Sequence, residues 1–265
     1  QEPFIEANPA YLTVENGIAN STLPADVKMI LNGMIAKRLG VFQNPYYHQI
    51  EALTTFYNDY DLFVATGTGS GKTECFLFPI LDYCYKNIGR KGIKVIILYP
   101  MNALATNQAR RLAQAIYADD RLRGKVTAGL FIGKGQDKKD FRLEMEEDGI
   151  IESREAILAN PPDILLTNFK MLDMGIMKAE FSNLWSYNTA DPDVLQFLIL
   201  DELHTYDGAQ GTDVANLIRR LKLRLGKEKV TLCGVGTSAT IGTVRESKEL
   251  LCNYASEVYG ELFDT

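Results

Sequence analysis

The sequence predicts an α/β protein with a mostly parallel central sheet and helices on both of its faces. Three observations predict this fold class. Short apolar runs alternate with helical stretches along the chain, which is typical of consecutive βαβ units. A glycine-rich turn ending in Gly-Lys-Thr follows one run, and two adjacent acids follow another. In such sheets, motifs that follow strands meet at the carboxyl edge, where ligands bind.

The order of the elements follows from these runs. We expect strands at residues 62–64, 94–98, 126–131, 163–166, 197–200 and 230–235. Residues 1–40 contain Pro3, Pro9 and Pro24 and then a helical stretch at 25–39, with Val27, Ile30, Leu31, Met34 and Ile35 on one face. We interpret 1–40 as an N-terminal helical extension that packs on the main domain, 41–265. Helices are also expected from residue 46 through Phe56 and at 245–259, and the charged stretch 133–148 is expected to be a solvated loop and helix.

Composition narrows the function classes. The 265 residues are 46% hydrophobic and 23% charged, with a net charge of −6. This charge argues against a uniformly basic nucleic-acid-binding surface, although it leaves room for a local groove. No apolar run is long enough to span a membrane. We expect the four cysteines to be free thiols in a reducing cytoplasm, and because the chain begins with Gln1 we expect it to be a piece of a longer protein.

The glycine-rich turn has the layout of a phosphate-binding loop. Its sequence, at residues 65–73, is Ala-Thr-Gly-Thr-Gly-Ser-Gly-Lys-Thr. Such a loop aims backbone N–H groups and a helix N-terminus at a polyphosphate. We expect phosphate contacts from Thr68, Gly69, Ser70, Gly71, Lys72 and Thr73, with the Thr73 hydroxyl on Mg²⁺. Thr66 stands where the general pattern has Gly or Ala, so this is a variant loop; a chance Gly/Ser/Thr linker is the alternative.

The acidic pair follows the apolar run at 197–200. A buried strand that ends in Asp201 and Glu202 delivers two carboxylates to the sheet edge. We expect Asp201 to hold Mg²⁺ through its water shell and Glu202 to polarise the attacking water. The alternative is an ordinary acidic turn. Hydroxyl residues at 237, 238 and 240 follow the last predicted strand and can hydrogen-bond the acids.

Gln49 opens the helix that precedes the phosphate loop. A glutamine amide matches the N6 and N7 edge of adenine, because it offers both a donor and an acceptor. Tyr46 or Tyr47 can stack on the base. Core packing by an aromatic-rich helix start is the alternative.

Together these residues resemble a superfamily 2 helicase of the DExH type over residues 46–242. Gln49 resembles the Q motif, residues 71–73 motif I, Asp201 to His204 motif II, and residues 238–240 motif III. The resemblance implies a RecA-like P-loop NTPase domain that uses ATP and Mg²⁺. It also implies that His204, Ser238 and Thr240 couple ATP to nucleic acid.

The same resemblance implies contacts to a single strand of nucleic acid. Residues 99–108 resemble motif Ia and residues 167–168 motif Ib, and both contact phosphates without reading sequence. The implied nucleic-acid-binding residues are Pro100, Asn102, Ala103, Gln108, Gly133, Thr167 and Asn168. Pro100 and Gly133 could instead be simple turn residues.

Residues 204–211 and the helix after them narrow the subgroup. With the Tyr-Pro-x-x-Ala-Leu form of motif Ia, they resemble the MrfA- and Lhr-like branch and large bacterial phage-defence helicases, which favours DNA over RNA. Arg219, Arg220, Lys222 and Arg224 give that helix a basic side, interpreted as a solvated face or a nucleic-acid contact.

The family requires a second RecA-like domain with an arginine finger, and nothing after Thr240 resembles it. We therefore expect ATP binding with weak hydrolysis, because such an arginine contributes about 10³–10⁵-fold. Two other functions stay open: a duplex translocase that does not separate strands, and a nucleotide-sensing module without nucleic acid.

Overall fold

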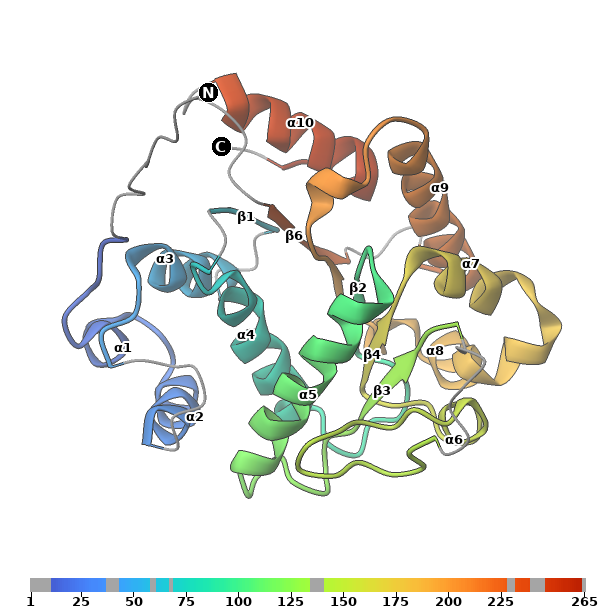
Figure 1. Cartoon of the computed structure of the whole chain (residues 1–265), viewed down its shortest axis with the longest axis horizontal. Coiled ribbons are helices and arrows are strands. Elements are labelled where there is room, and N and C mark those ends of the chain that lie inside the picture. The colour runs from blue at the N-terminus through green and yellow to red at the C-terminus, as the bar shows by residue number, and fades with distance from the viewer. Residues whose placement is uncertain are drawn as a thin grey trace, which may run out of the picture.

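The computed structural model describes residues 11–36, 43–57, 61–66, 69–133, 141–227, 232–238 and 246–263, without the side chains of Ile30 and residues 246–248. Its centre is a six-stranded sheet with the order β1-β6-β5-β2-β4-β3 (Figure 1). All strand pairs in this sheet are parallel. The strands are β1 Leu62–Ala65, β2 Val95–Leu98, β3 Ala128–Phe131, β4 Ile164–Thr167, β5 Phe197–Leu200 and β6 Cys233–Ser238. The predicted fold class is confirmed.

Helices connect and flank these strands. The α-helices are α1 Gly17–Asn20, α2 Ala25–Ala36, α3 Tyr47–Phe56, α4 Lys72–Lys86, α5 Asn102–Ala118, α6 Arg154–Ala159, α7 Phe169–Met177, α8 Ser186–Ala190, α9 Gly208–Arg224 and α10 Glu246–Tyr259. Short 3₁₀ helices are η1 Ala179–Trp185, η2 Pro192–Val194 and η3 Leu203–Thr205. None of the helices that the structure describes has the length and hydropathy needed to cross a membrane.

The sheet is buried on both faces. Along β2, Val95 and Ile97 belong to a core cluster with α4 and α5. Ile96 and Leu98 point the other way, into a second cluster with α7, α9 and α10. A strand alternates its side chains between the two faces, so continuous apolar runs are what a sheet covered twice requires.

The N-terminal helices belong to the first of these clusters. Val27, Leu31 and Met34 of α2 are buried together with residues of α3 and α4. These three residues of the predicted apolar face therefore pack in the same core as α3 and α4, and the side chain of Ile30 lies outside the described residues. Figure 1 shows α1 next to α3 and α2 next to α1, at the margin of the molecule. The described helix ends at Ala36, and residues 37–39 of the predicted helix lie outside the described residues.

The structure shifts several predicted strand ends by one or two residues and differs more clearly from two other predictions. The last strand was expected to end at Val235, but β6 continues through Ser238. It continues because it lies between β1 and β5, and Ala65 still pairs with Ser238. The helix expected within 133–148 is not found in the described part, 141–148, where an isolated bridge joins Glu146 to Gly149.

Two of the four cysteines are buried, as is common for cysteines that remain thiols. Cys75 and Cys84 of α4 are buried in the core. Burial raises the pKa of the Cys75 thiol to about 12. Cys233 and Cys252 are half-buried.

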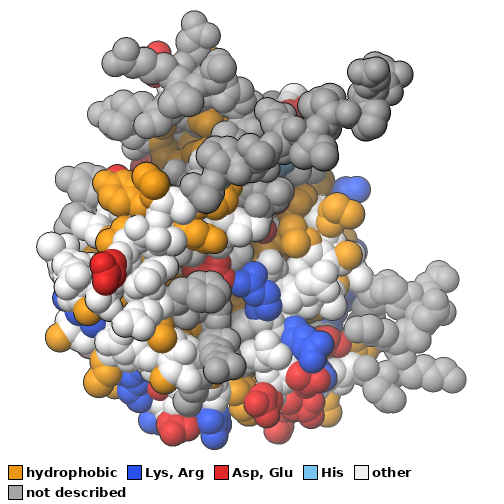
Figure 2. Space-filling view, turned by 60° about the vertical axis from the view of Figure 1, so that its left-hand side comes forward, with side chains coloured by type: hydrophobic (Ala, Val, Ile, Leu, Met, Phe, Trp, Pro, Cys, Tyr) orange, Lys and Arg blue, Asp and Glu red, His pale blue; other side chains and the backbone are white. Residues whose placement is uncertain are grey.

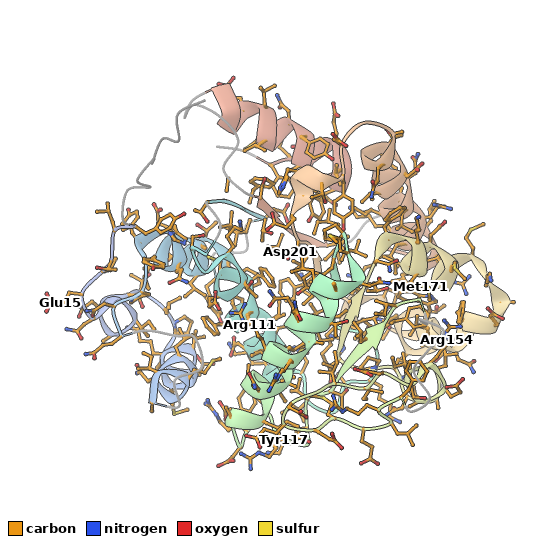
Figure 3. The ribbon with its side chains drawn as sticks, viewed as in Figure 1. Glu15, Arg111, Tyr117, Arg154, Met171 and Asp201 are labelled. Atoms are coloured by element: carbon orange, nitrogen blue, oxygen red, sulfur yellow. The ribbon has the colours of Figure 1, made fainter. Side chains whose placement is uncertain are left out.

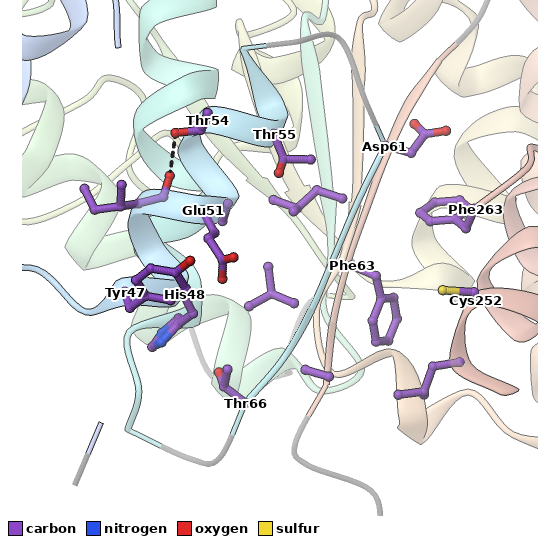
Figure 4. A pocket seen from close by; sticks show the side chains of 16 residues that line it. Tyr47, His48, Glu51, Thr54, Thr55, Asp61, Phe63, Thr66, Cys252 and Phe263 are labelled. Atoms are coloured by element: carbon purple, nitrogen blue, oxygen red, sulfur yellow. Dashed lines mark hydrogen bonds between the residues drawn. The ribbon is translucent and has the colours of Figure 1, made fainter. Parts of the chain in front are cut away.

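A large cavity lies along the outer edge of β1. Among the strands that the structure describes, β1 pairs only with β6, at one end of the sheet. The cavity, about 660 Å³, is lined by α3 on one side and α10 on the other, with Phe63 of β1 between them (Figure 4). It also reaches His48 and Thr66. The edge cavity therefore adjoins the glycine-rich turn, and neither Asp201 nor Glu202 lines it.

Candidate functional site

The glycine-rich turn connects β1 to α4, and its backbone geometry requires glycine. Gly69 and Gly71 have φ angles of 77° and 76°, which side chains rarely allow. A Cβ on Gly71 would also lie 2.3 Å from Nε2 of Gln49, whereas one on Gly69 would meet nothing within 4 Å. Gly71 is the N-cap residue of α4, so the loop leads directly into a helix N-terminus. Thr68 lies outside the described residues.

Lys72 is held by the turn that it follows. Its ammonium donates to the carbonyl of Thr66 at 3.1 Å and lies 3.7 Å from Oε1 of Glu202. The Thr66 hydroxyl is bonded to that of Ser70. Thr66 is not among the residues with positive φ, so the departure from Gly or Ala introduces no backbone strain and adds a hydrogen bond within the loop.

The start of α3 is attached to the same loop. Gln49 accepts a hydrogen bond from the backbone of Tyr46 at 3.0 Å and donates to the carbonyl of Gly71 at 3.1 Å. Nε2 of His48 lies 2.9 Å from the carbonyl of Ser70, and its ring stacks on that of Tyr46. The oxygen and the nitrogen of the Gln49 amide therefore both form hydrogen bonds within this protein. Its predicted contact with adenine stays a prediction.

The two acids stand at the end of β5. Asp201 is buried, and its carboxylate accepts a hydrogen bond from the hydroxyl of Thr237. The same hydroxyl accepts from the backbone N–H of Glu202 at 3.0 Å. Burial raises the pKa of Asp201, and the Thr237 hydrogen bond opposes this shift. One hydroxyl thus holds both members of the acidic pair.

Glu202 has an unusual backbone. Its φ of 51° and ψ of 51° are left-handed, which costs about 1–3 kcal/mol for a residue other than glycine. Such strain persists where the surroundings determine the position of a side chain. Here it accompanies the placement of a carboxylate oxygen beside Lys72.

Ser238 and His204 come together as predicted for a contact between the acidic motif and the last strand. Nδ1 of His204 lies 3.1 Å from the Ser238 hydroxyl and 3.3 Å from Oε2 of Glu202. That glutamate oxygen has no hydrogen bond among the described residues, so its contact with His204 is a close approach only. Thr240 lies outside the described residues.

These groups surround one cavity of about 510 Å³ at the carboxyl edge of the sheet. Its lining combines the start of α3, the turn, α5 and the end of β5. Lining residues that the sequence singled out are Tyr46, Gln49, Gly69, Ser70, Gly71, Lys72, Thr73, Asp201 and Glu202. Figure 3 shows Arg111 on α5 and Asp201 at the end of the strands. We name this the nucleotide cavity.

Three residues of this region were not predicted as site residues. Arg111 and Glu74 line the cavity, and Thr237 lies behind it. Glu74 directly follows the Gly-Lys-Thr signature, and Arg111 lies on α5 beyond the segment predicted as motif Ia. Neither Glu74 nor Arg111 belongs to a motif that a single sequence would reveal. Thr237 was among the hydroxyl residues expected to hydrogen-bond the acids, and it does so, but it was not assigned to the site.

A second cavity, of about 620 Å³, lies where three helices begin. It is lined by Pro100 and Asn102 at the start of α5, by the start of α7, and by residues 209, 210 and 213 of α9. The Asn168 amide donates to Oδ1 of Asn102 at 2.6 Å, and its own Oδ1 accepts from the backbone of Met171. The predicted motif Ia and Ib segments are therefore in direct contact. We name this the helix-start groove.

Other predicted nucleic-acid residues lie elsewhere. Thr167 is fully buried and its hydroxyl donates to the carbonyl of Phe131, so its side chain does not reach the groove. Gln108 lines the nucleotide cavity and accepts from Arg111. Ala103 is exposed on the first turn of α5, and Gly133 follows β3 at the surface.

Charge is mixed on this protein. On the face in Figure 2, Lys and Arg side chains stand next to Asp and Glu side chains and form no continuous basic area among the described residues. The basic side of α9 is paired as well, because Arg220 lies 2.9 Å from Asp173 and Lys222 binds Glu261. These pairs favour the interpretation of that side as a structural and solvated face.

The parallel sheet, the turn before α4 and the acids after β5 define a P-loop NTPase domain of the RecA-like type. The chain belongs to the DEAD/DEAH box helicase family, whose sequence profile matches residues 46–247. The helicase family predicted from the motifs is therefore confirmed.

Relatives of known name agree with this assignment. The chain is 27% identical to the Druantia protein DruE of Escherichia coli over 94% of its own length and 18% of that protein. It is 31% identical to the ATP-dependent helicase MJ1574 of Methanocaldococcus jannaschii over 83% of its length and 29% of the relative. The structure of the DUF1998 helicase MrfA bound to DNA and AMPPNP matches with a TM-score of 0.70 and 23% identity, over 97% of this chain and 31% of that one. The last likeness concerns the fold. The chain spans less than a third of each relative.

Proposed function

We propose that this chain is the first motor domain of an ATP-dependent nucleic-acid helicase or translocase that acts on DNA. One observation carries the proposal: the nucleotide cavity and the helix-start groove lie on the same carboxyl edge of the sheet and share α5. In a motor, the occupancy of the nucleotide site must change the affinity of the site for nucleic acid. Two sites that share a helix can be coupled through it.

The nucleotide cavity has the chemistry that a nucleoside triphosphate requires. The N-terminus of α4 and Lys72 would hold the phosphates. The Thr73 hydroxyl and the Asp201 carboxylate line the same cavity and would hold Mg²⁺, which supplies charge neutralisation when bound. No group of three or more His, Cys, Asp or Glu residues in the described part of the chain could hold a metal by itself. Oxygen ligands from the nucleotide are therefore part of the proposed site.

Glu202 is the proposed general base. Its carboxylate is within 3.7 Å of the Lys72 ammonium, so it stands beside the position that the terminal phosphate would take. A carboxylate there can orient and deprotonate the attacking water. The contact from Lys72 to the Thr66 carbonyl would be exchanged for phosphate oxygens when nucleotide binds.

The helix-start groove is the proposed contact with a single strand. Neither α5 nor α9 has a side-chain cap at its N-terminus, so first-turn N–H groups remain for a ligand. Such groups bind phosphate without reading sequence. This mode of binding needs no extended basic surface, which agrees with the mixed charge.

We further propose that a second RecA-like domain closes on the nucleotide cavity and contributes the arginine finger. DNA as the track is supported by the likeness to MrfA, whose structure contains DNA, and by the motif Ia form; a role in antiviral defence stays a prediction.

The test is ATP turnover by the chain joined to its second motor domain, without polynucleotide and then with single-stranded DNA, duplex DNA or single-stranded RNA. Stimulation by single-stranded DNA, together with strand displacement, is the expected result. Stimulation by duplex DNA without displacement would identify a translocase, and ATP binding without any stimulation would identify a nucleotide sensor.

A further inference from the structure

Glu74 is a buried carboxylate on the phosphate-loop helix, and its cation comes from another helix. Its side chain is 7% exposed, and Arg111 of α5 donates a hydrogen bond to its Oε1. Arg111 also donates to Gln108 at 3.2 Å. Figure 3 shows Arg111 on α5, next to α4. A carboxylate this deep requires a partner, because an unpaired buried charge is strongly unfavourable.

The position of Glu74 matters for a phosphate ligand. It is the third residue of α4, and its Oε2 lies 3.1 Å from where a Cβ of Gly71 would stand. The carboxylate therefore sits against the loop that is proposed to hold the triphosphate. Left uncompensated, its negative charge would oppose a polyanion at the same helix N-terminus. Arg111 removes that opposition.

The helix that carries Arg111 also reaches the second site. Asn102, the first residue of α5, binds Asn168 in the helix-start groove. Arg111 lies nine positions further along the helix, about 14 Å at 1.5 Å per residue. A continuous helix of this length moves as a rigid body. A shift of α5 at the helix-start groove therefore also moves Arg111 relative to Glu74.

We propose that the Arg111–Glu74 ion pair is a positioning contact that couples the nucleotide cavity to the helix-start groove through α5. The inference rests on the proposed function and adds a route between its two sites. A nucleic-acid strand bound at the start of α5 determines the position of Arg111. The position of Arg111 determines how completely the negative charge of Glu74 is neutralised beside the phosphates. By linkage, nucleotide then changes the affinity for the strand by the same factor.

The test measures dissociation constants of a fluorescent N-methylanthraniloyl analogue of ATP with Mg²⁺, in the absence and presence of a saturating oligothymidylate. Arg111→Ala should weaken nucleotide binding by about tenfold or more, because it leaves Glu74 buried and unpaired beside the ligand. The Arg111→Ala/Glu74→Gln double variant should regain most of that affinity. It should still lack the effect of oligothymidylate, which in the unsubstituted chain should be about fivefold or larger.

Arg110→Ala is the matched control. Arg110 is the neighbouring arginine on α5 and is exposed, so its loss changes the net charge and the helix sequence to the same extent. This variant should keep both the affinity and the oligothymidylate effect. Thermal unfolding of all variants identifies any loss of folding in Arg111→Ala, and the double variant, with no buried charge, keeps the test valid in that case.

The outcomes separate the two proposals. No nucleotide binding by the unsubstituted chain would overturn the proposed function and this coupling with it. Nucleotide binding that Arg111→Ala leaves unchanged would overturn the coupling alone. A double variant that responds to oligothymidylate as strongly as the unsubstituted chain would also overturn it.

Discussion

The two cavities at the carboxyl edge are built in different ways. In the nucleotide cavity, polar side chains are held by other parts of the chain: Gln49 by the loop, Lys72 by the carbonyl of Thr66, and Asp201 by Thr237. Among the described lining residues of the helix-start groove, one hydrogen bond joins two side chains, from Asn168 to Asn102. Its lining also includes the side chains of Lys170, Gln210 and Asp213 and the backbone at the starts of α5, α7 and α9.

This difference matches what each ligand requires. Hydrolysis depends on positioning a few atoms within tenths of an ångström, so the groups must be preorganised by hydrogen bonds. A strand that slides must be bound without a fixed register, and helix starts bind phosphates in any sequence. Substitutions should therefore have large effects in the first cavity and small ones in the second.

The largest effect is expected for Glu202→Gln in a preparation that turns over ATP. The amide cannot accept the proton of the attacking water, so kcat should fall by about 10²–10⁴-fold while nucleotide still binds. Single-turnover hydrolysis and equilibrium nucleotide binding measure the two effects. Retained turnover would assign the base to another residue.

Gly71→Ala should have the next largest effect, with Gly69→Ala as its control. Both residues have positive φ, so both variants carry similar backbone strain. Only at Gly71 would the new methyl group collide with Gln49. Gly71→Ala should therefore lower the free energy of unfolding by about 1–3 kcal/mol more than Gly69→Ala and detach α3 from the loop. Chemical denaturation provides the comparison, and equal losses would show that the Gln49 contact is dispensable.

Asp201→Asn should stabilise the fold while abolishing turnover. Burial raises the pKa of Asp201 above its ordinary value of 3.8, so the folded state binds its proton more tightly than the unfolded state does. The contribution of Asp201 to the free energy of unfolding therefore falls as pH rises from 3.8 through the folded-state pKa and stays lower above it.

The asparagine has no such penalty. The variant should be more stable than the parent at pH 7, and the difference should vanish in strong acid. Urea unfolding at several pH values checks the sign. A variant less stable than the parent at neutral pH would show that the charge of Asp201 is stabilised in the fold.

The smallest effects belong to the groove. Asn168→Ala removes both the cap of α7 and the bond to Asn102, so the free energy of unfolding should fall by about 1 kcal/mol. Asn102→Ala removes only the second contact and should leave stability nearly unchanged. Each should reduce affinity for single-stranded DNA by less than about tenfold, because backbone groups carry much of the proposed binding. A loss of DNA affinity as large as the effects expected in the nucleotide cavity would show that the two sites do not differ in their sensitivity to substitution.

Local patterns in the sequence were sufficient for the fold class and for the main chemical groups. Apolar runs that end in polar motifs predict parallel strands, and the glycine spacing of the loop reflects φ angles that glycine alone adopts easily. The last strand was predicted too short because Gly236 interrupts the apolar run and glycine is depleted in strands. Pairing with β1 and β5 on both sides overrides that preference.

The tertiary structure alone decided which of these groups meet. Thr237 and Asp201 are 36 residues apart, Arg111 and Glu74 are 37 apart, and Asn102 and Asn168 are 66 apart. A residue's own periodicity determines which face of an element it occupies. Which other element packs on that face depends on the order of strands in the sheet. The sequence by itself therefore determined the fold class and the residues that carry charge, and packing decided that Gln49 binds the loop, that Thr167 is buried, and that Arg111 reaches the phosphate-loop helix.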